Sequence, residues 1–223
     1  ALPVRESHSR LVPFAYQPIV EKIMAQAGPR SPIEANTSLR VLGKQLEGPH
    51  PKIKVGNAEI IPHSITDTEI ILSLSDAPSL QAGIQPLQVL HSSPSSAVPV
   101  ASNACPFVLR PTITSVQVAE IEGIDDDPRG GSLQISAHLP VGANQRVVIA
   151  LNEWSIETPA VYLFEAPARK QDTTCLTIPF TGVKPGDYLI RLQVDGADSQ
   201  LGVDTDPSSK TFNWFNSPRV VIE

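Results

Sequence analysis

The 223-residue sequence has few of the residues on which catalytic, metal or disulfide chemistry depends. It has two cysteines, Cys105 and Cys175, which are not a disulfide framework, although the sequence leaves a bridge between them open. No Cys-x-x-Cys or His-x-x-x-His spacing indicates zinc, and neither a Gly-x-Ser-x-Gly turn nor a P-loop is present. We therefore expect two idle thiols, no cofactor and no enzymatic activity.

Charge is scarce as well, because Asp, Glu, Lys and Arg make up 18% of the chain and the net charge is −6. Nucleic acid is bound through clustered Lys and Arg, so no nucleic-acid partner is expected. No apolar run reaches the roughly 18 residues of a membrane-spanning helix, and no signal peptide is recognisable. The chain begins at Ala1 and its only methionine is Met24, so we expect a piece of a longer protein.

The strongest positive feature is an internal repeat. Five segments recur in the same order, with Leu39 matching Leu133 and Val55 matching Ile149 in two of them. The pairs are QPIVEKI (17–23) with RPTITSV (110–116), TSLRVLGKQL (37–46) with GSLQISAHL (131–139), IKVGNAEI (53–60) with VVIALNEW (147–154), AGIQPLQVL (82–90) with PGDYLIRLQV (185–194), and NACPFVL (103–109) with NSPRVVI (216–222). The repeat predicts duplication of one unit.

The repeat decides between a helix and a strand at residues 17–27. Ile19, Ile23 and Ala27 have helical spacing, but the matching segment in the second copy is rich in Thr, Ile and Val, which favour strands. We predict a strand over 18–23, with one helical turn near residues 24–27 as the alternative. Short alternating segments and 22 prolines then predict an all-β chain of two tandem immunoglobulin-like antiparallel β-sandwiches.

Alternation also predicts which side chains face the cores. Leu39, Val41 and Leu46 are expected to point inward, and Arg40 and Lys44 outward. In the second unit Leu189 and Val194 are expected to point inward on either side of an outward Arg191. Trp154 and Tyr188 are the large side chains expected at the second core, where each polar atom needs a partner.

Two acidic stretches are candidates for a metal. EGIDDDPRGG contains Asp125, Asp126 and Asp127, and the second stretch, DGADSQLGVDTD, contains Asp204 and Asp206. Ca²⁺ takes six to eight oxygen ligands, often from such loops, so a calcium site is conceivable if both loops meet at one end of the second sandwich. Neither stretch has EF-hand spacing, and solvated loop tips are the simpler interpretation. In particular, DGADS is typical of a plain turn.

Aromatic residues are few but gather near the C-terminus, where TFNWFNSP contains Phe212, Trp214 and Phe215. If this stretch is a strand, Phe212 and Trp214 point to one side and Phe215 to the other. An exposed apolar patch on either side would be an interaction surface, and packing against a loop is the alternative.

A family resemblance rests on these same segments. TSLRVLGKQL followed by KIKVGNAEI is similar to the IPT/TIG class of immunoglobulin-like domains, although EANTS replaces the usual glycine before the strand. The resemblance implies one such sandwich over residues 17–111. Residues 112–223 keep GGSLQI but have VVIALNEW in place of the VG pair, which implies a second, divergent sandwich.

The tandem as a whole resembles the C-terminal region of the cap, or tail terminator, of bacterial phage-tail-like contractile injection systems. The stretches that carry this likeness include LQAGIQPLQVLH, NACPFVLRP and FNSPRVVI. It implies that residues 1–16 are a linker from a missing N-terminal domain and that the partners are other subunits of a particle assembled in the bacterial cytoplasm. The whole protein would be hexameric, and this piece alone monomeric.

Three functions are open at this point. The first is a non-enzymatic structural or interaction module of a larger bacterial protein. The second is a carbohydrate-binding or adhesive module of a secreted or surface protein, which predicts an exposed aromatic platform or Ca²⁺ held by the aspartate loops. The third, DNA binding of the kind some sandwich domains perform, is disfavoured by the charge.

Overall fold

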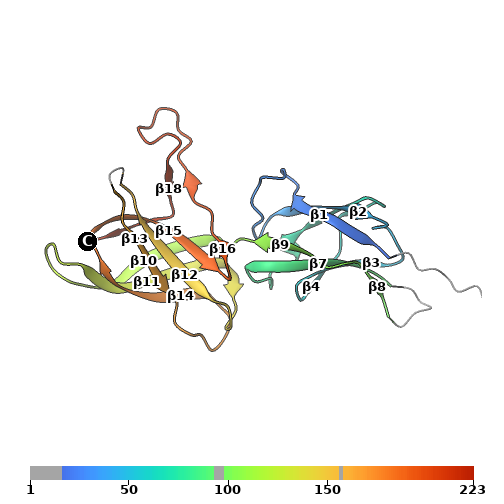
Figure 1. Ribbon diagram of the computed structural model, residues 1–223, viewed down its shortest axis with the longest axis horizontal. Coiled ribbons are helices and arrows are strands. Elements are labelled where there is room, and N and C mark those ends of the chain that lie inside the picture. The colour runs from blue at the N-terminus through green and yellow to red at the C-terminus, as the bar shows by residue number, and fades with distance from the viewer. Residues whose placement is uncertain (1–16, 93–97, 156–157) are drawn as a thin grey trace, which may run out of the picture.

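The computed structural model describes residues 17–92, 98–155 and 158–223, and the expected linker at 1–16 lies outside them. The protein is built from antiparallel strands, with one short 3-10 helix, η1 (Leu74–Asp76), within these ranges (Figure 1). No helix in the described part of the chain is long and apolar enough to cross a membrane. The all-β prediction is therefore confirmed.

The N-terminal half forms two antiparallel sheets. One sheet has the order β1-β2-β6-β5, and the other has the order β4-β3-β7-β8, with β9 also paired to β7. The strands are β1 (Ile19–Ala25), β2 (Ser38–Lys44), β3 (Pro51–Val55), β4 (Ala58–Ile60), β5 (Ser64–Ile65), β6 (Glu69–Ser73), β7 (Gly83–His91), β8 (Val100–Ala101) and β9 (Cys105–Leu109).

The C-terminal half repeats this arrangement. One sheet has the order β10-β11-β14, and the other has the order β13-β12-β15-β16, with β19 also paired to β15. Strands β17 and β18 form a separate two-stranded sheet. The strands are β10 (Ile113–Glu122), β11 (Arg129–Val141), β12 (Val147–Glu153), β13 (Val161–Glu165), β14 (Thr173–Val183), β15 (Gly186–Val194), β16 (Ala197–Asp198), β17 (Gly202–Val203), β18 (Phe215–Ser217) and β19 (Arg219–Ile222).

The strand registers bear out most of the sequence repeat. Ile23 pairs with Val41 in the first half, and the residues matched to them, Val116 and Ile135, pair with each other in the second. Gly83 likewise pairs with Leu109, as Gly186 does with Ile222. Residues 19–25 form a strand and residues 26–27 a turn, with no helix. The strand prediction is therefore confirmed and the helical alternative is wrong.

One segment of the repeat was aligned wrongly. Ile53 pairs with Val89, and Ile149 pairs with Leu192. Counting from the paired glycines, Val89 and Leu192 hold the same place in β7 and β15, so Ile149 corresponds to Ile53 and not to Val55. A shift of two residues keeps every side chain on the same face of the sheet, which is why the apolar pattern did not reveal it.

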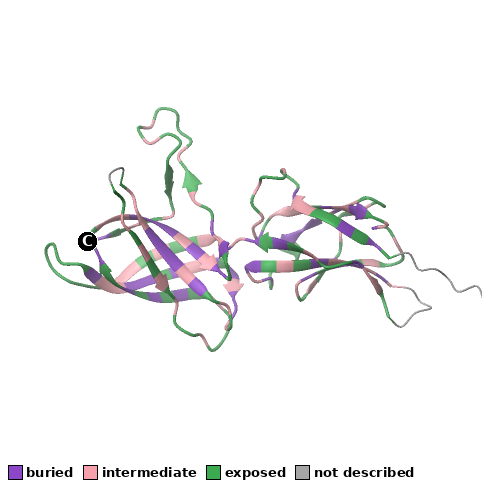
Figure 2. Ribbon diagram, in the orientation of Figure 1, coloured by how far each residue is buried: buried purple, intermediate pink, exposed green. Residues whose placement is uncertain are grey.

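Two hydrophobic cores fill the spaces between the sheets, as the buried stripes in Figure 2 show. Leu39, Val41 and Leu46 are buried in the first, as predicted. Tyr188 is fully buried in the second, where its hydroxyl donates a hydrogen bond to the Lys184 carbonyl over 2.8 Å. Burial raises the pKa of Tyr188 to about 12.

Two predictions for the second core were wrong. Tyr188, Ile190, Leu192 and Val194 point into the core from β15, so Leu189 lies on the outer face together with Arg191. Trp154 is only partly buried and is not a member of the core. It follows β12 in phase with the outward residues of that strand, because Val147, Ile149 and Leu151 point inward.

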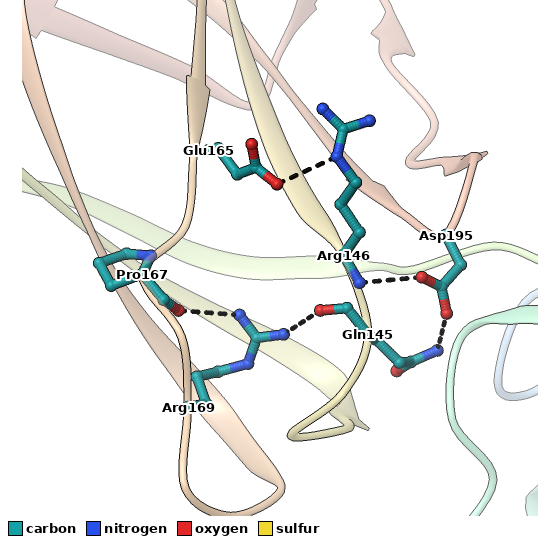
Figure 3. Close-up of polar contacts among 6 residues, drawn as sticks. All are labelled: Gln145, Arg146, Glu165, Pro167, Arg169 and Asp195. Carbon is teal, nitrogen blue, oxygen red and sulfur yellow. Dashed lines mark hydrogen bonds and ion pairs between the residues drawn. The ribbon is translucent and has the colours of Figure 1, made fainter.

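The two halves interlock where they meet. Leu139 of β11 packs in the first core, and Ala82, just before β7, packs in the second. The Gln145 side-chain amide donates to the Ala82 carbonyl over 2.7 Å. The same amide donates to Asp195 over 2.9 Å (Figure 3). The Gln81 amide donates to Asp172 over 2.7 Å. Apolar side chains exchanged between the cores and side-chain hydrogen bonds together link the two halves.

The last strand of each half is interrupted by a serine in the same way. The amide of Ser102 donates to the Val89 carbonyl while its hydroxyl oxygen accepts from the Val89 amide over 2.9 Å. Ser199 forms the same pair of bonds with Leu192, with the same 2.9 Å to the hydroxyl. In each half the hydroxyl oxygen takes the place of a strand carbonyl as acceptor. The chain can therefore leave the sheet without leaving a buried amide unpaired.

Replacing these serines tests the repeated interruption. Ser199→Ala and Ser102→Ala each leave a buried amide unsatisfied, and we expect each to lower the free energy of unfolding by about 1–3 kcal/mol. Chemical denaturation measures this, with Ser79→Ala as the control, because Ser79 is exposed. Loss of the same small amount in all three variants would contradict the role given to the hydroxyls.

Candidate functional site

The predicted aromatic and acidic residues near the C-terminus lie in one insertion. Between the two parts of the last strand, the first half has only residues 102–104, whereas the second half has residues 199–218. This segment, the inserted hairpin, contains β17 and β18, which pair through Gly202 with Ser217 and Val203 with Phe215. It projects from the sheet at the top of Figure 1.

Aspartates tie the tip of the inserted hairpin. One oxygen of Asp204 accepts from the Asp206 amide over 3.0 Å, and the other accepts from the Thr211 hydroxyl over 2.7 Å. Asp206 accepts from the amide and the hydroxyl of Ser208, at 2.9 and 2.7 Å. Hydrogen bonds from Ser209 and Thr211 lower the pKa of Asp204, and those from Ser208 lower that of Asp206. Both carboxylates serve the turn itself.

The other acidic stretch lies elsewhere, between β10 and β11. The buried Arg129 donates to the Asp125 carbonyl over 2.7 Å, to the Asp127 carbonyl over 2.6 Å and to the Glu223 carbonyl over 2.9 Å. Asp125, Asp126 and Asp127 are exposed. Among the described residues, no group of three or more His, Cys, Asp or Glu could hold a metal ion.

The structure does not bring the two groups of calcium candidates together within the described ranges. Asp204 and Asp206 use their oxygens within the inserted hairpin, and Asp125–Asp127 are held by an arginine that binds their backbone and not their carboxylates. The prediction of a plain turn at DGADS is confirmed, because Asp195 and Gly196 have φ angles of 47° and 85°. The two cysteines are free thiols.

Where the inserted hairpin meets the outer face of the sheet, aromatic side chains surround an open hollow of about 380 Å³. We call it the aromatic hollow. The buried Leu189 of β15 lies at its base. Trp154, Trp214 and Phe215 form its apolar walls, and the polar groups on it include Glu153 and Asn213. Trp214 and Phe215 are 42% and 53% exposed, so their rings face solvent.

Trp154 connects the sheet to the inserted hairpin. Its indole N–H donates to the Phe215 carbonyl over 2.8 Å, and its ring meets Trp214 edge to face with the centroids 6.3 Å apart. The Arg219 guanidinium lies 4.3 Å from the centroid of Trp154 and 3.5 Å from an oxygen of Asp187. A hydrogen bond at the edge and a cation over one face fix the orientation of this ring.

Phe212 does not belong to the hollow, although it is 42% exposed. The predicted alternation fails here because residues 211–214 form a turn, and β18 begins only at Phe215. Trp214 and Phe215 therefore line the same hollow, and Phe212 stands apart. Phe212, Trp214 and Phe215 are all exposed, as the predicted patch requires, but only Trp214 and Phe215 line the hollow.

Sequence reasoning missed Trp154 and Leu189 as site residues because it assigned both to the core. The phase of β12 was the signal that could have found Trp154, since Val148, Ala150 and Asn152 alternate with the buried Ile149 and Leu151. Leu189 is buried beside the inserted hairpin and not against the opposite sheet. Its burial was therefore predicted correctly, but its place in the core was not.

Comparisons with known proteins add little to this geometry. Residues 111–221, which cover β10–β19 almost completely, match the family model of a domain of unknown function (DUF8756). The structure of the surface glycan-binding protein PbSGBP-B from Prevotella bryantii is similar, with a TM-score of 0.41 and 14% identity over 91% of this chain. The chain spans 47% of that protein. No curated protein matches the sequence.

The aspartates at the tip give a pH prediction. A folded-state pKa below the ordinary value of 3.8 means that Asp204 and Asp206 support the turn above that pH and lose this effect as the pH falls through the lowered value. We expect the amide resonances of residues 204–214 to lose their dispersion in acid, and Asp204→Ala to produce the same change at neutral pH. Asp126→Ala is the control, and unchanged hairpin resonances in Asp204→Ala would contradict the prediction.

Proposed function

We propose that this chain is a non-enzymatic binding module whose ligand is a glycan held in the aromatic hollow. The observation that carries the proposal is the group of exposed rings of Trp154, Trp214 and Phe215 around Leu189. Large rings exposed in one place are costly to leave in water, and on a soluble protein they mark an interaction surface. The carbohydrate-binding alternative thus has more support than the structural one.

The chemistry of the hollow suits a sugar. One side of a pyranose ring presents C–H groups, which pack on the electron-rich face or edge of an aromatic ring, and its rim presents hydroxyls. Glu153 and Asn213 offer a carboxylate and an amide to such hydroxyls. One Glu153 oxygen already accepts from the Ala160 amide over 2.9 Å, which fixes the carboxylate in place.

The shape of the aromatic hollow favours binding to the middle of a polysaccharide chain over binding to its end. It lies on the outer face of a sheet beside a projecting hairpin, and it is open and not enclosed. A ligand longer than one ring can therefore enter and leave without a steric stop. We infer that polysaccharides bind better than free monosaccharides.

We also infer that the binding unit is the second of two immunoglobulin-like sandwiches, at residues 17–111 and 112–223. The repeated strand pairing, the two separate cores and the equivalent serines at 102 and 199 support this division. The match of the family model to residues 111–221 supports the same boundary. Membership of the IPT/TIG class stays a proposal from the sequence motifs.

Truncating one ring tests the site. Trp214→Ala removes an exposed wall of the hollow and little of the core, so we expect polysaccharide affinity to fall at least tenfold with a change in unfolding free energy below about 1 kcal/mol. Titration calorimetry against polysaccharides selected from a glycan array measures both wild type and variant.

Phe212→Ala is the matched control for this experiment. It removes a ring with the same 42% exposure from the same hairpin but from outside the hollow, so its affinity should stay within twofold of wild type. Equal losses in both variants would show that the hairpin as a whole, and not the aromatic hollow, supports binding. No binding to any glycan by the wild-type chain would refute the proposal.

A structural or interaction module of a larger bacterial assembly is the second candidate. The interlocked joint favours it, since Leu139 and Ala82 each pack in the core of the opposite half. A stiff two-part rod is suited to holding a binding surface at a fixed distance from other subunits. The tail-terminator role, a hexameric full-length protein, a monomeric piece and a cytoplasmic site of assembly remain proposals from the sequence resemblance alone.

The joint itself can be tested. Changing both Gln81 and Gln145 to Ala removes the two side-chain amides that bridge the halves, and we expect more bending while each half stays folded. Small-angle scattering measures this as a broader distribution of radii of gyration. A wild-type chain already as flexible as the double variant would contradict a rod-like role, and sedimentation of the same samples reports the oligomeric state.

A further inference from the structure

A second hollow lies on the same sheet face as the aromatic hollow. Cross-strand pairing places Asn152 beside Leu189 and Ala150 beside Arg191, so the two hollows occupy successive rows of the sheet β13-β12-β15. The second hollow, about 250 Å³, is lined by the outward side chains of these strands and is called the arginine hollow. Its lining includes Arg146, Ala150, Leu163, Arg191, Gln193 and Asp198.

Arg191 is the one guanidinium on this face without a partner in the described part of the chain. Arg146 is paired with Glu165 over 3.0 Å, as Figure 3 shows. Asp198 accepts a hydrogen bond from the Gln193 amide over 3.1 Å. The Arg191 guanidinium has neither a hydrogen bond nor an ion pair there, although the residue is half-buried on the outer face of β15, beside β12.

The surroundings of Arg191 strengthen its attraction for an anion. Its cross-strand neighbour is Ala150, whose own neighbour on the other side is Leu163. These apolar side chains lower the local dielectric, so an arriving carboxylate gains more than it would at a fully exposed cation. Asp198 is the carboxylate that lines the same hollow, and it accepts from Gln193 and is not paired with Arg191. A guanidinium also matches a carboxylate with two parallel hydrogen bonds.

The distance between the hollows sets the size of the ligand. Trp154 lies four residues beyond Ala150 along β12, which corresponds to about 13 Å in an extended strand. A single sugar ring cannot reach from the indole of Trp154 to the guanidinium of Arg191, but a short run of linked rings can. One ligand that uses both hollows must therefore be a chain that carries negative charge.

We propose that the glycan recognised by this face is an acidic polysaccharide, with a ring packed in the aromatic hollow and a uronate carboxylate bound by Arg191 in the arginine hollow. The inference rests on the proposed function and names its ligand class. The two cations of the arginine hollow, one of them unpaired, complement such a chain despite the net charge of −6.

The N-terminal half provides a built-in comparison. At the place of the pair Ala150–Arg191 it has Lys54 and Gln88, and at the place of Leu189–Arg219 it has two prolines, Pro86 and Pro106. It therefore has a cation on the same outer face but no aromatic wall and no inserted hairpin. Lys54→Gln removes one positive charge from an equivalent position and is the matched control for Arg191→Gln.

The experiment compares polygalacturonate, alginate and hyaluronate with their carboxyl-reduced forms, using wild type, Arg191→Gln, Lys54→Gln and Trp214→Ala. Wild type and Lys54→Gln are expected to bind at least one acidic polymer about tenfold more tightly than its neutral form. Arg191→Gln should bind both forms equally, with an affinity near that of wild type for the neutral form. Trp214→Ala should lose affinity for both forms.

The outcomes separate the two proposals. If wild type binds a polymer and its reduced form equally, or if Arg191→Gln keeps the preference for the acidic form, the carboxylate site is refuted while the glycan site stands. If Lys54→Gln lowers the preference as much as Arg191→Gln does, the effect is one of overall charge and the arginine hollow is refuted. If wild type binds no polymer of either series, the glycan site itself is refuted.

Discussion

The sheet face that carries the aromatic hollow depends on a break in the last strand that leaves no backbone hydrogen bond unmade. The chain leaves the sheet at Ser199, immediately after β16. The Ser199 hydroxyl oxygen accepts a hydrogen bond from the Leu192 amide, which would otherwise have no partner. The chain then returns at β19 and pairs with the first part of β15. Because both ends of the break are satisfied on the sheet, the inserted hairpin between them can vary in length and sequence without disturbing the core.

The same break in the two halves has different consequences. In the first half, the chain from Ser102 to β9 is short, and the Asn103 side chain exchanges hydrogen bonds with the backbone of Val20, both at 2.9 Å. In the second half the long insertion brings Trp214 over the outer face, where Trp154 meets it. The two halves thus share the interrupted last strand, and only in the second does an insertion cover part of the outer face.

The sequence predicted the strands of the scaffold well because the facing of a side chain is a local property of an alternating segment. The facing of Leu39 and Val41 and the match of Gly83 to Gly186 followed from period-two patterns that the core enforces. The site was harder to predict, because the burial of Leu189 depends on a hairpin that joins the sheet thirty residues later. Trp154, just after β12, is also apolar enough to be assigned to the core unless its position in the alternation of that strand is counted.

The arginine hollow could not be predicted from the acidic composition of the chain. A net charge of −6 argues against binding a polyanion through the summed field of the protein, as nucleic acid requires. It says nothing about one guanidinium whose nearest cross-strand neighbours are Ala150 and Leu163. The local dielectric and the lack of an ion-pair partner for its guanidinium determine the affinity of such a group, and both arise only when β12, β13 and β15 lie side by side. Recognition of an acidic glycan by Arg191 and aromatic rings is therefore compatible with an acidic protein.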